Sequence, residues 1–453
     1  MRPSNCLPTL LLALLAACSG GDSAASDSIA PPTTIADGSF ARIQRDILNV
    51  SCVSCHKTGD ANARQSGLVL TADSSYQQLM GVPSRQRTAN ANGLPRIKAF
   101  RSDSSLFYHK LAWIPGHHSV DYGNLMPMGT VQGVTAGQLE YVRRWIEAGA
   151  PRSGHVADTL VLRDSRVQAA TFTPLPAPTS AGLQFKVDSF AVTPLSEREL
   201  FVNRRVGNAT DLYITRIESR MRPGSHHLLL YSFDERNTAF PCNTRPTVDV
   251  VRDIRNRDGT LNLLNMLPMA CHVYFAGAMT PDFDYRFPAG VALRLPANTS
   301  LDFNVHYVNR SPADLAGEAF ANLYFTDRAN IQTVARTLNY ANQDIPLPPG
   351  RRTTHTKVFS MPTRTTILGL TSHMHALGEK FEIRMRRANG TESVVYVNTD
   401  WEHPGFVNFA TPLVLEAGDA LVSVVTWNNT TTRTVSFGLA SSDEMNIIFG
   451  YAY

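Results

Sequence analysis

Apolar positions recur with two different periods along the chain. In residues 40–48 and 139–146 they lie three or four residues apart, which predicts two amphipathic helices. From about residue 184 onward, short runs alternate between apolar and polar residues and are separated by turn residues, as in 301–307. This period of two predicts short strands that pack as β-sandwiches. We therefore expect a helical N-terminal part followed by an all-β C-terminal part.

Helix stop signals and turn residues set the limits of these parts. The second helix is expected to start at Thr135, which forms a capping-box pattern with Gln138, and to stop at 149–151. Residues 171–179 are rich in Pro, Thr and Ala and predict a semi-rigid linker. The strand-rich remainder is long for one sandwich, so we expect two, joined near 346–350.

Composition and charge exclude several classes of protein. The chain has 453 residues, of which 43% are hydrophobic, so it can bury large cores and is not a disordered chain. Its 42 Lys and Arg against 38 Asp and Glu give a net charge of only +4, and no basic run supports binding of nucleic acid. No apolar stretch reaches roughly eighteen residues, which excludes a protein with several membrane-spanning helices.

The N-terminus carries the pattern of an export signal. The first two residues precede an apolar run over residues 7–17 that is too short for a stable membrane anchor. The small residues before Cys18 resemble a bacterial lipobox, in which residues 1–17 are removed and the cysteine is lipidated; an ordinary signal peptide cut nearby is the alternative. Ser19 favours the outer membrane of the bacterial cell envelope, facing the periplasm or the cell surface. Residues 18–36 predict a flexible tether.

The cysteines fall into three groups. Cys6 would leave with the signal peptide, and Cys18 would carry the lipid. Two further cysteines share the motif described next, which leaves Cys242 and Cys271. In an oxidising compartment this leftover pair is expected to form a disulfide, and two free buried thiols are the alternative.

The segment Cys52-Val-Ser-Cys55-His56 has the C-x-x-C-H spacing of covalent haem attachment. Two thiols add to the two haem vinyl groups, and the adjacent imidazole then lies beneath the iron. A zinc site would need a second ligand pair nearby, and a thioredoxin-like motif would need a strand and a helix around it. Residues 37–151 therefore resemble a class I cytochrome c, in which the first and last helices cross over the haem.

The sixth iron ligand is expected in the loop before the last helix of this domain. Met126 and Met128 are both present there, and the Met-Pro step at Met126 resembles the cytochrome pattern better. Pro127 restricts the backbone of the residue before it and helps to hold such a loop. Met126 is the predicted ligand, with Met128 and the pair His117 and His118 as alternatives.

Histidines stand out in the strand-rich part. His373 and His375 are two residues apart, so on a strand both project from one face and can bind one metal ion. The neighbours His226 and His227 would point to opposite faces of a regular strand, so joint ligation requires a bulge or a strand end. His306 lies in another predicted strand.

One methionine extends this set of possible ligands. Met445 lies near the C-terminus in the segment Asp443-Glu-Met445-Asn. Imidazole together with thioether favours copper, in particular Cu(I), over magnesium or calcium. Taken singly, each of these residues is more often a packed or surface residue than a metal ligand.

In this order, the four segments resemble the copper type II monooxygenases, the group that contains peptidylglycine α-hydroxylating monooxygenase and dopamine β-monooxygenase. The resemblance covers about residues 185–453. It implies one copper ion on the first sandwich and a second, oxygen-binding copper ion on the second sandwich. The implied ligands are His226, His227 and His306 for the first ion, and His373, His375 and Met445 for the second.

Together these patterns predict a multidomain fold. A small all-α cytochrome c domain is followed by two all-β, jelly-roll-like sandwiches. The expected boundaries are 37–151 for the cytochrome domain, 152–184 for a linker, 185–345 for the first copper sandwich and 346–453 for the second.

Three positions depart from the family pattern and bear on the substrate. The peptidylglycine hydroxylases carry an Arg two residues before the first His of the H-x-H, and Thr371 stands there in this chain. Their Asn and Tyr two and four residues beyond the Met are Ile447 and Phe449. A peptide with a C-terminal carboxylate is therefore a poor candidate, and a less polar substrate is expected; packing is the alternative role of Phe449.

The resemblance implies hydroxylation of an aliphatic C–H bond of a small organic substrate with O2 at the His373, His375 and Met445 copper. The other copper would store and deliver the second electron. Ascorbate supplies electrons in the animal relatives, and an ascorbate-like reductant or a periplasmic redox protein is the expected donor for this chain. We expect the fused haem to pass electrons to copper, because tethering raises its effective concentration at its partner.

Two other classes of function remain open from the sequence. One is a non-catalytic electron-transfer or copper-binding surface lipoprotein. The other is an adhesion or structural lipoprotein whose β part binds a partner. Oxygen consumption coupled to a hydroxylated product would separate the enzyme from both.

Overall fold

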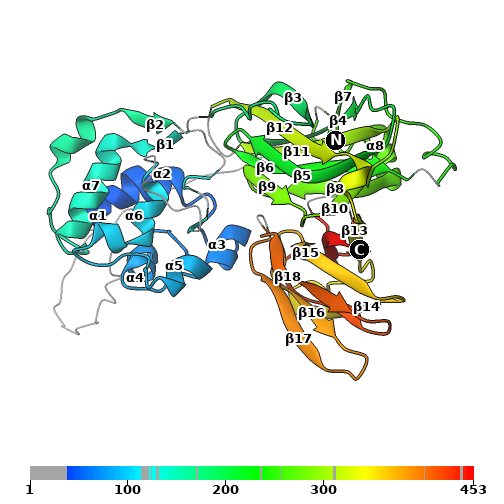
Figure 1. Cartoon of the computed structure of the whole chain (residues 1–453). Helices are drawn as coiled ribbons and strands as arrows, with labels where there is room; N and C mark the ends of the chain where they lie inside the picture. The colour runs from blue at the N-terminus through cyan, green and yellow to red at the C-terminus, as the bar shows by residue number, and fades with distance from the viewer. Residues whose placement is uncertain are drawn as a thin grey trace, which may run out of the picture. The chain divides into compact units, whose positions relative to one another are not determined.

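The structure is a computed structural model of the whole chain (Figure 1). It describes residues 38–113, 122–123, 125–128, 132–169, 172–234, 237–256, 258–309, 313–401, 404–438 and 442–453. The expected signal peptide, the lipidation site Cys18 and the tether over 18–36 lie outside these residues. Among the described residues, no helix is both long enough and apolar enough to cross a membrane.

The N-terminal part is helical, as the apolar spacing predicts (Figure 1). It starts with α1 (Ser39–Ile43), which continues through the π-helical turn η1 (Gln44–Leu48) into α2 (Asn49–Ser51). Short helices follow at α3 (Ala61–Ser66), α4 (Ser75–Leu79), α5 (Arg87–Ala91) and α6 (Leu106–Leu111). The long helix α7 (Ala136–Glu147) begins with the predicted capping box of Thr135 and Gln138.

The first and last of these helices share one core. Phe40 and Ile43 of α1 and Tyr141 and Trp145 of α7 are buried in the same apolar cluster. The ring centroids of Phe40 and Trp145 lie 5.3 Å apart. Both helices therefore bury the faces that their apolar periodicity predicts.

The helical part also contains a short β-ribbon. β1 (Gln132–Thr135) pairs antiparallel with β2 (Val167–Ala169). The N-terminal part is therefore not all-α as expected. The segment that follows α7 folds back, and its strand β2 pairs with β1, which precedes α7.

The segment expected as a linker, 152–184, forms hydrogen bonds with the helical part near one end and with the first sandwich near the other. The backbone amides of Val156 and Ala157 donate to Ser39 Oγ at 2.9 and 3.1 Å, so this end packs on α1. At the other end, the carbonyl of Pro176 accepts a hydrogen bond from the Asn322 side chain at 2.9 Å. The linker is therefore held by hydrogen bonds as well as stiffened by its prolines.

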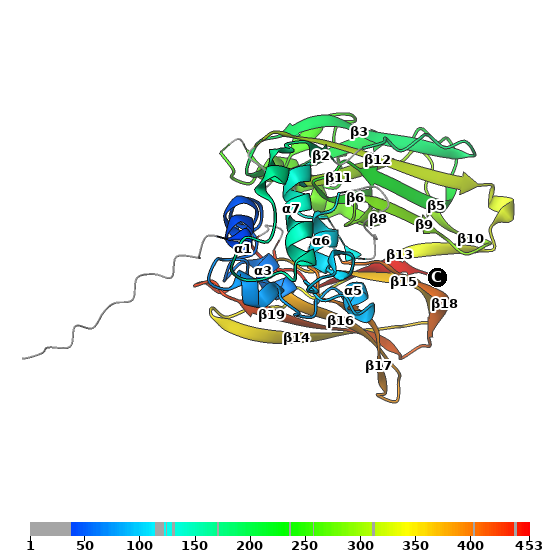
Figure 2. The same cartoon turned by 90° about the vertical axis from the view of Figure 1, so that its left-hand side faces the viewer.

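The first sandwich consists of two sheets packed on a common apolar core (Figures 1 and 2). One sheet has the strand order β7-β4-β11-β6-β8. Its strands are β4 (Ser196–Arg205), β6 (Ser225–Phe233), β7 (Val251–Asp253), β8 (His272–Ala278) and β11 (Ser300–Asn309). The strands of the facing sheet are β3 (Gly182–Val192), β5 (Leu212–Met221), β9 (Asp282–Arg286), β10 (Val291–Leu295) and β12 (Leu315–Thr326).

The second sandwich continues one of these sheets. β13 (Thr333–Ala341) pairs with β10 on one side and with β20 (Ile447–Ala452) on the other, and a nine-stranded sheet of described residues results. β15 (Thr365–His373) and β18 (Val407–Leu415) complete that sheet. The covering sheet consists of β14 (Arg351–Ser360), β16 (Gly378–Arg386), β17 (Glu392–Asn398) and β19 (Ala420–Asn429). The prediction of a β-sandwich architecture is confirmed.

Alternation along β11 decides which of its side chains enter the core. Leu301, Phe303 and Val305 are fully buried in the apolar core between the two sheets. Asn304 and His306 occupy the intervening positions, so they project from the opposite face of the sheet. This outer face of the five-stranded sheet carries the candidate site described below.

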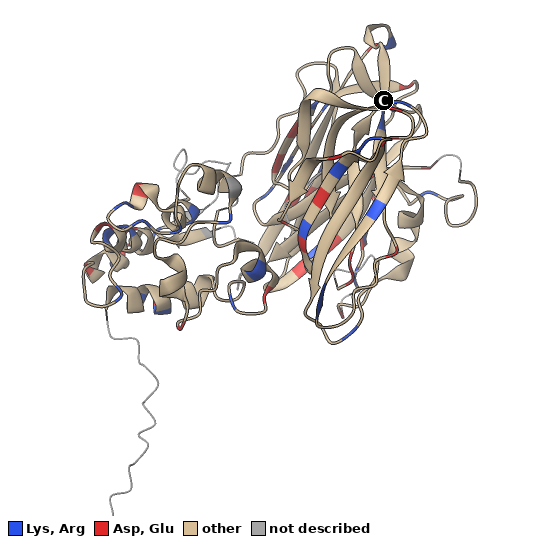
Figure 3. Ribbon diagram, turned by 90° about the horizontal axis from the view of Figure 1, so that it is seen from below, with Lys and Arg blue, Asp and Glu red and all other residues tan. Residues whose placement is uncertain are grey.

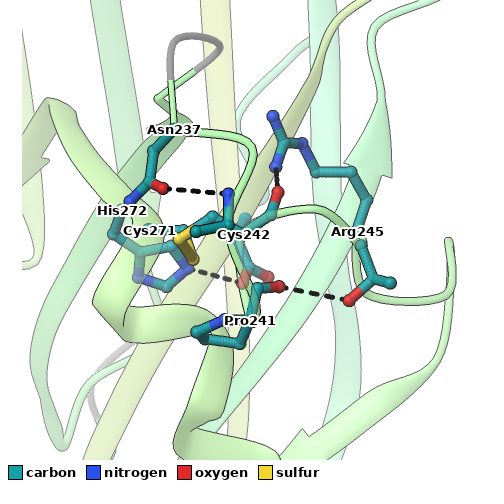
Figure 4. The surroundings of a disulfide bond; sticks show 9 residues. Asn237, Pro241, Cys242, Arg245, Cys271 and His272 are labelled. Atoms are coloured by element: carbon teal, nitrogen blue, oxygen red, sulfur yellow. Dashed lines mark hydrogen bonds and ion pairs between the residues drawn. A yellow bond between two sulfur atoms is a disulfide. The ribbon is translucent and has the colours of Figure 1, made fainter.

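A disulfide joins Cys242 and Cys271, as the cysteine count predicts (Figure 4). Both cysteines are buried, and Cys271 directly precedes β8. His272 follows, and its Nε2 lies 2.9 Å from the carboxylate of Asp302. The disulfide therefore closes a loop beside the strands that carry the outer-face polar residues.

Charges of both signs are interspersed on the strands (Figure 3). Across β5 and β9, Arg216 pairs with Asp284 at 2.6 Å and Arg220 pairs with Asp282 at 2.7 Å. Exposed pairs of this kind each contribute little to stability. Their mixture agrees with the low net charge of the chain.

Candidate metal centres

A bulge brings three histidines together on the outer face of the first sandwich. His306 of β11 pairs with His227 of β6, whereas Tyr307 pairs with Ser225, so His226 is skipped in the register. This bulge turns His226 to the same side as its neighbour, as joint ligation requires. One ring nitrogen from each of the three histidines lies within 4.8 Å of the others.

Hydrogen bonds at the outer nitrogens orient two of these rings. His227 Nε2 lies 2.7 Å from Asn304 Oδ1, and His306 Nε2 lies 3.1 Å from Glu197 Oε2. Both partners are acceptors, so each Nε2 carries the proton and each Nδ1 keeps its lone pair.

The Nδ1 atoms of His226 and His227 lie 3.0 Å apart. Two nitrogens that are each about 2.0–2.1 Å from one metal ion lie roughly this far apart. The triad therefore fits a divalent or monovalent transition-metal ion bound through imidazole nitrogen.

Two carboxylates lie beside the triad. The hydrogen bond from His306 lowers the pKa of Glu197. Burial opposes ionisation of Glu199, but its electrostatic interactions with the imidazoles of His306 and His227 and the hydrogen bond from Asn304 outweigh it and hold its pKa at about 2. Both side chains are therefore anionic at neutral pH and favour a bound cation.

A second pair of histidines lies at the end of β15 in the second sandwich. The ring centroids of His373 and His375 are 5.1 Å apart, and His375 Nδ1 lies 2.9 Å from the carbonyl oxygen of Asp443. That carbonyl accepts the Nδ1 proton, which leaves Nε2 with its lone pair. Burial lowers the pKa of His373 well below its ordinary value and also lowers that of His375. Both rings are neutral and able to bind metal at neutral pH.

Residues on either side of Met445 are bonded to the segment that carries these two histidines. It is buried, with 8% of its surface exposed. On its N-terminal side, Glu444 accepts hydrogen bonds from the backbone amide of His375 at 2.9 Å. On its C-terminal side, Ile447 pairs with His373 across β20 and β15. The segment Asp443–Ile447 therefore lies alongside the H-x-H segment in space.

The three positions that depart from the family pattern adjoin His373. Thr371 pairs with Phe449, and His373 pairs with Ile447, on the same two strands. The Phe449 ring packs against Tyr274, with centroids 4.6 Å apart. Thr371, Ile447 and Phe449 therefore flank His373 on the two paired strands.

The predicted haem-attachment motif lies between α2 and α3. Cys52 and Cys55 are free thiols. His56 Nδ1 lies 3.1 Å from the carbonyl oxygen of Leu68, which accepts its proton and leaves Nε2 for an iron ion. The donor types and the ring orientation fit covalent haem.

The predicted sixth ligand is anchored by its backbone. Met126 is partly buried against the helical core, its amide donates to the carbonyl of Lys110 at 2.7 Å, and its carbonyl accepts from Trp113 Nε1 at 2.9 Å. The alternatives His117 and His118 lie outside the described residues.

Four polar residues of these centres were not predicted from the sequence. Glu197 and Glu199 alternate on β4, Asn304 lies two residues before His306, and Glu444 directly precedes Met445. Spacing by two residues predicts that Glu197 and Glu199 share one face of their strand, and that Asn304 shares a face with His306. It does not reveal that these two strands are neighbours in the sheet. Glu444 belongs to the segment Asp443-Glu-Met445-Asn, but its role as a buried hydrogen-bond acceptor is visible only in the structure.

Comparisons with known proteins give weak similarity. No protein-family model and no curated protein match the chain. A protein with a triple jelly-roll fold from an archaeal virus is 6% identical over 58% of this chain, with a TM-score of 0.17, and the match spans only 59% of that protein. VP54 of PBCV-1 is 8% identical, with a TM-score of 0.21, over 62% of this chain and 95% of that one. The exported protein XepA of PBSX is 9% identical, with a TM-score of 0.18, over 61% of this chain and 88% of that one. TM-scores this low carry no argument about this chain.

Proposed function

We propose that the chain is a copper-dependent monooxygenase of the copper type II class, with a covalently bound haem c in its helical part. It hydroxylates an aliphatic C–H bond of a small organic substrate with O2. The single observation that carries this proposal is the bulge at His226, which gathers three imidazoles within 4.8 Å. If these histidines only packed in the fold, no strand bulge would be needed to bring a ring nitrogen of each one close to the other two.

The two donor sets favour copper over other metals. Three imidazoles alone suit zinc or copper, but two imidazoles with the thioether of Met445 favour copper, and Cu(I) in particular. When bound, copper supplies the one-electron redox chemistry that activates O2. His226, His227 and His306 would hold the ion that stores an electron, and His373, His375 and Met445 would hold the ion at which substrate reacts.

The side chains beside His373 support a proposal for the class of substrate. Ile447 and Phe449 present apolar surface, and Thr371 supplies a hydroxyl whose hydrogen bond goes to the carbonyl of Gly405 at 3.1 Å. A carboxylate would find no cationic partner among these residues, whereas an uncharged apolar molecule would lose little on leaving water. We propose an uncharged, largely apolar substrate.

The helical part supplies electrons in this proposal. Cys52 and Cys55 attach the haem, and His56 and Met126 ligate its iron. Arg64 of α3, close after the haem motif, donates a hydrogen bond to the carbonyl of Ala376 at 3.3 Å. Ala376 directly follows His375, so this contact supports electron transfer from a bound haem to a copper ion that His375 would help to hold. An ascorbate-like reductant or a periplasmic redox protein reduces the haem.

The proposed location is the bacterial cell envelope, with lipid on Cys18 and the outer membrane as the anchoring surface. The disulfide of Cys242 and Cys271 supports an oxidising compartment. The proposed partners are O2, the organic substrate, the electron donor and the membrane, without nucleic acid.

The test uses the full-length protein with haem attached. About two copper ions should bind per chain, and O2 consumption should match hydroxylated product when apolar candidate substrates are supplied. His226→Ala and His375→Ala should each remove about one copper ion and abolish product. His355→Ala, in a histidine of β14 outside both centres, is the matched control and should retain both ions. Bound copper without any product would instead indicate an electron carrier, and copper-free protein would indicate a structural or adhesion role.

A further inference from the structure

Two acidic side chains of β4 face the histidine triad. β4 pairs antiparallel with β11, and Glu199 stands directly opposite His306 in the register. Glu197 lies two residues away, so alternation places both carboxylates on the same outer face as His306.

The first carboxylate contacts the triad directly. Glu197 Oε2 accepts from His306 Nε2 at 3.1 Å, and its other oxygen, Oε1, lies 2.8 Å from Arg255 Nη2. A chain of charge-assisted contacts thus runs from Arg255 through Glu197 to the outer edge of the His306 ring.

The second carboxylate acts mainly through an amide. His227 Nε2 donates to Asn304 Oδ1 at 2.7 Å, and Asn304 Nδ2 donates to Glu199 Oε1 at 2.9 Å. Glu199 Oε1 also lies 3.6 Å from His227 Nε2. Asn304 is 2% exposed, so this relay is shielded from water.

We propose that Glu197 and Glu199 are positioning residues that lower the reduction potential of the copper held by His226, His227 and His306. This inference rests on the proposed function, because it assumes copper at the triad. The two carboxylates thereby make that copper a stronger one-electron donor.

The physical reason is charge. A carboxylate that accepts the outer N–H of an imidazole increases the basicity of the other ring nitrogen. The couple gains one electron when Cu(II) becomes Cu(I), so fixed negative charge nearby stabilises the oxidised ion more than the reduced ion. The low dielectric of a mostly buried site strengthens this effect.

Arg255 predicts an effect of opposite sign. Its guanidinium lies 2.8 Å from Glu197 Oε1 and offsets part of the charge of that carboxylate. Removing the guanidinium leaves more of the negative charge of Glu197 acting on His306. A purely structural network would not produce shifts of opposite sign from its two ends.

The experiment measures the midpoint potential of the triad copper by electron paramagnetic resonance during redox titration. It uses the full-length haem protein with His373→Ala and His375→Ala, so that the triad is the remaining proposed copper site. Glu197→Gln, which retains an acceptor oxygen, should weaken Cu(II) binding relative to Cu(I) about tenfold and raise the potential by about 59 mV. Glu199→Gln should shift it in the same direction, and Arg255→Gln should lower it.

Two controls complete the test. Asp282→Asn removes one negative charge at an exposed position of β9 and should leave the potential unchanged. Glu197→Asp keeps the charge and should shift the potential less than Glu197→Gln does. Copper that binds stoichiometrically with the same potential in all variants would overturn this inference and leave the proposed function standing. Failure of the triad to bind copper would overturn both.

Discussion

The backbone amide of His375 donates a hydrogen bond to the buried carboxylate of Glu444 at 2.9 Å. The same carboxylate accepts from the amide of Leu377 at 2.7 Å and from Trp427 Nε1 at 2.8 Å. Glu444 is fully buried, and burial raises its pKa to about 7. One side chain thus ties the H-x-H segment to the strand core and to Met445, its own neighbour.

Replacement of Glu444 by leucine should destabilise the second sandwich strongly. Three donors would be left buried without an acceptor, and each such loss costs about 1–3 kcal/mol, so the free energy of unfolding should fall by about 3 kcal/mol or more. Glu444→Gln keeps one acceptor oxygen and should cost less. Chemical denaturation checks both variants, and a loss for Glu444→Leu no larger than that for an exposed control, Glu416→Leu, would contradict this role.

The haem assignment predicts distinct effects for cysteine and methionine variants. Haem should stay with the wild-type chain through acid-acetone extraction, and Cys52→Ala should greatly reduce this covalent attachment because one thioether is lost. Met126→Ala should remove methionine ligation of the iron, which the absorption spectrum reports. An unchanged spectrum in Met126→Ala would assign the ligand to Met128 or to a histidine, and Met128→Ala is the matched comparison.

Met445 separates copper binding from oxygen chemistry. Met445→His should retain copper, because imidazole binds both oxidation states, yet it should abolish or strongly lower hydroxylation because the soft donor that favours the reduced ion is lost. Copper content and product formation are measured on the same preparation. Met385→Leu, in a partly buried methionine of β16 outside the centres, should retain both. Normal turnover by Met445→His would show that Met445 is a packing residue of the core and not a metal ligand.

Electron flow can be followed directly in anaerobic protein with pre-reduced haem. Addition of O2 and substrate together should oxidise the haem, since it is the proposed donor. A protease site placed before Leu175 keeps the hydrogen bond of Pro176 to Asn322 but separates the halves after cleavage. Cleavage should slow haem-driven turnover, because tethering supplies effective concentrations up to about the millimolar range. Turnover driven by a small diffusible reductant should stay unchanged, and haem that remains reduced through many turnovers would exclude it as the donor.

The local features of this protein could be predicted from its amino-acid sequence. The three- to four-residue apolar period indicated the helices at 39–51 and 136–147, and alternation indicated two β-sandwiches, because both periods follow from the geometry of one element. The capping box at Thr135 and the disulfide of Cys242 and Cys271 were also predicted and are present. The haem and copper ligands stay predictions, although the clustering of His226, His227 and His306 agrees with them.

The contacts between distant segments could not be predicted in this way, because they depend on how whole sheets pack. His306 and Glu197 are 109 residues apart in the chain, and the register of β11 against β4 brings them together. The bulge that turns His226 beside His227 depends on the same kind of pairing, between β6 and β11. Strand register follows from the packing of whole sheets and from the turns between them, and periodicity within one strand does not specify it. For this reason the ligand types were visible in the sequence, whereas the carboxylates that surround them were not.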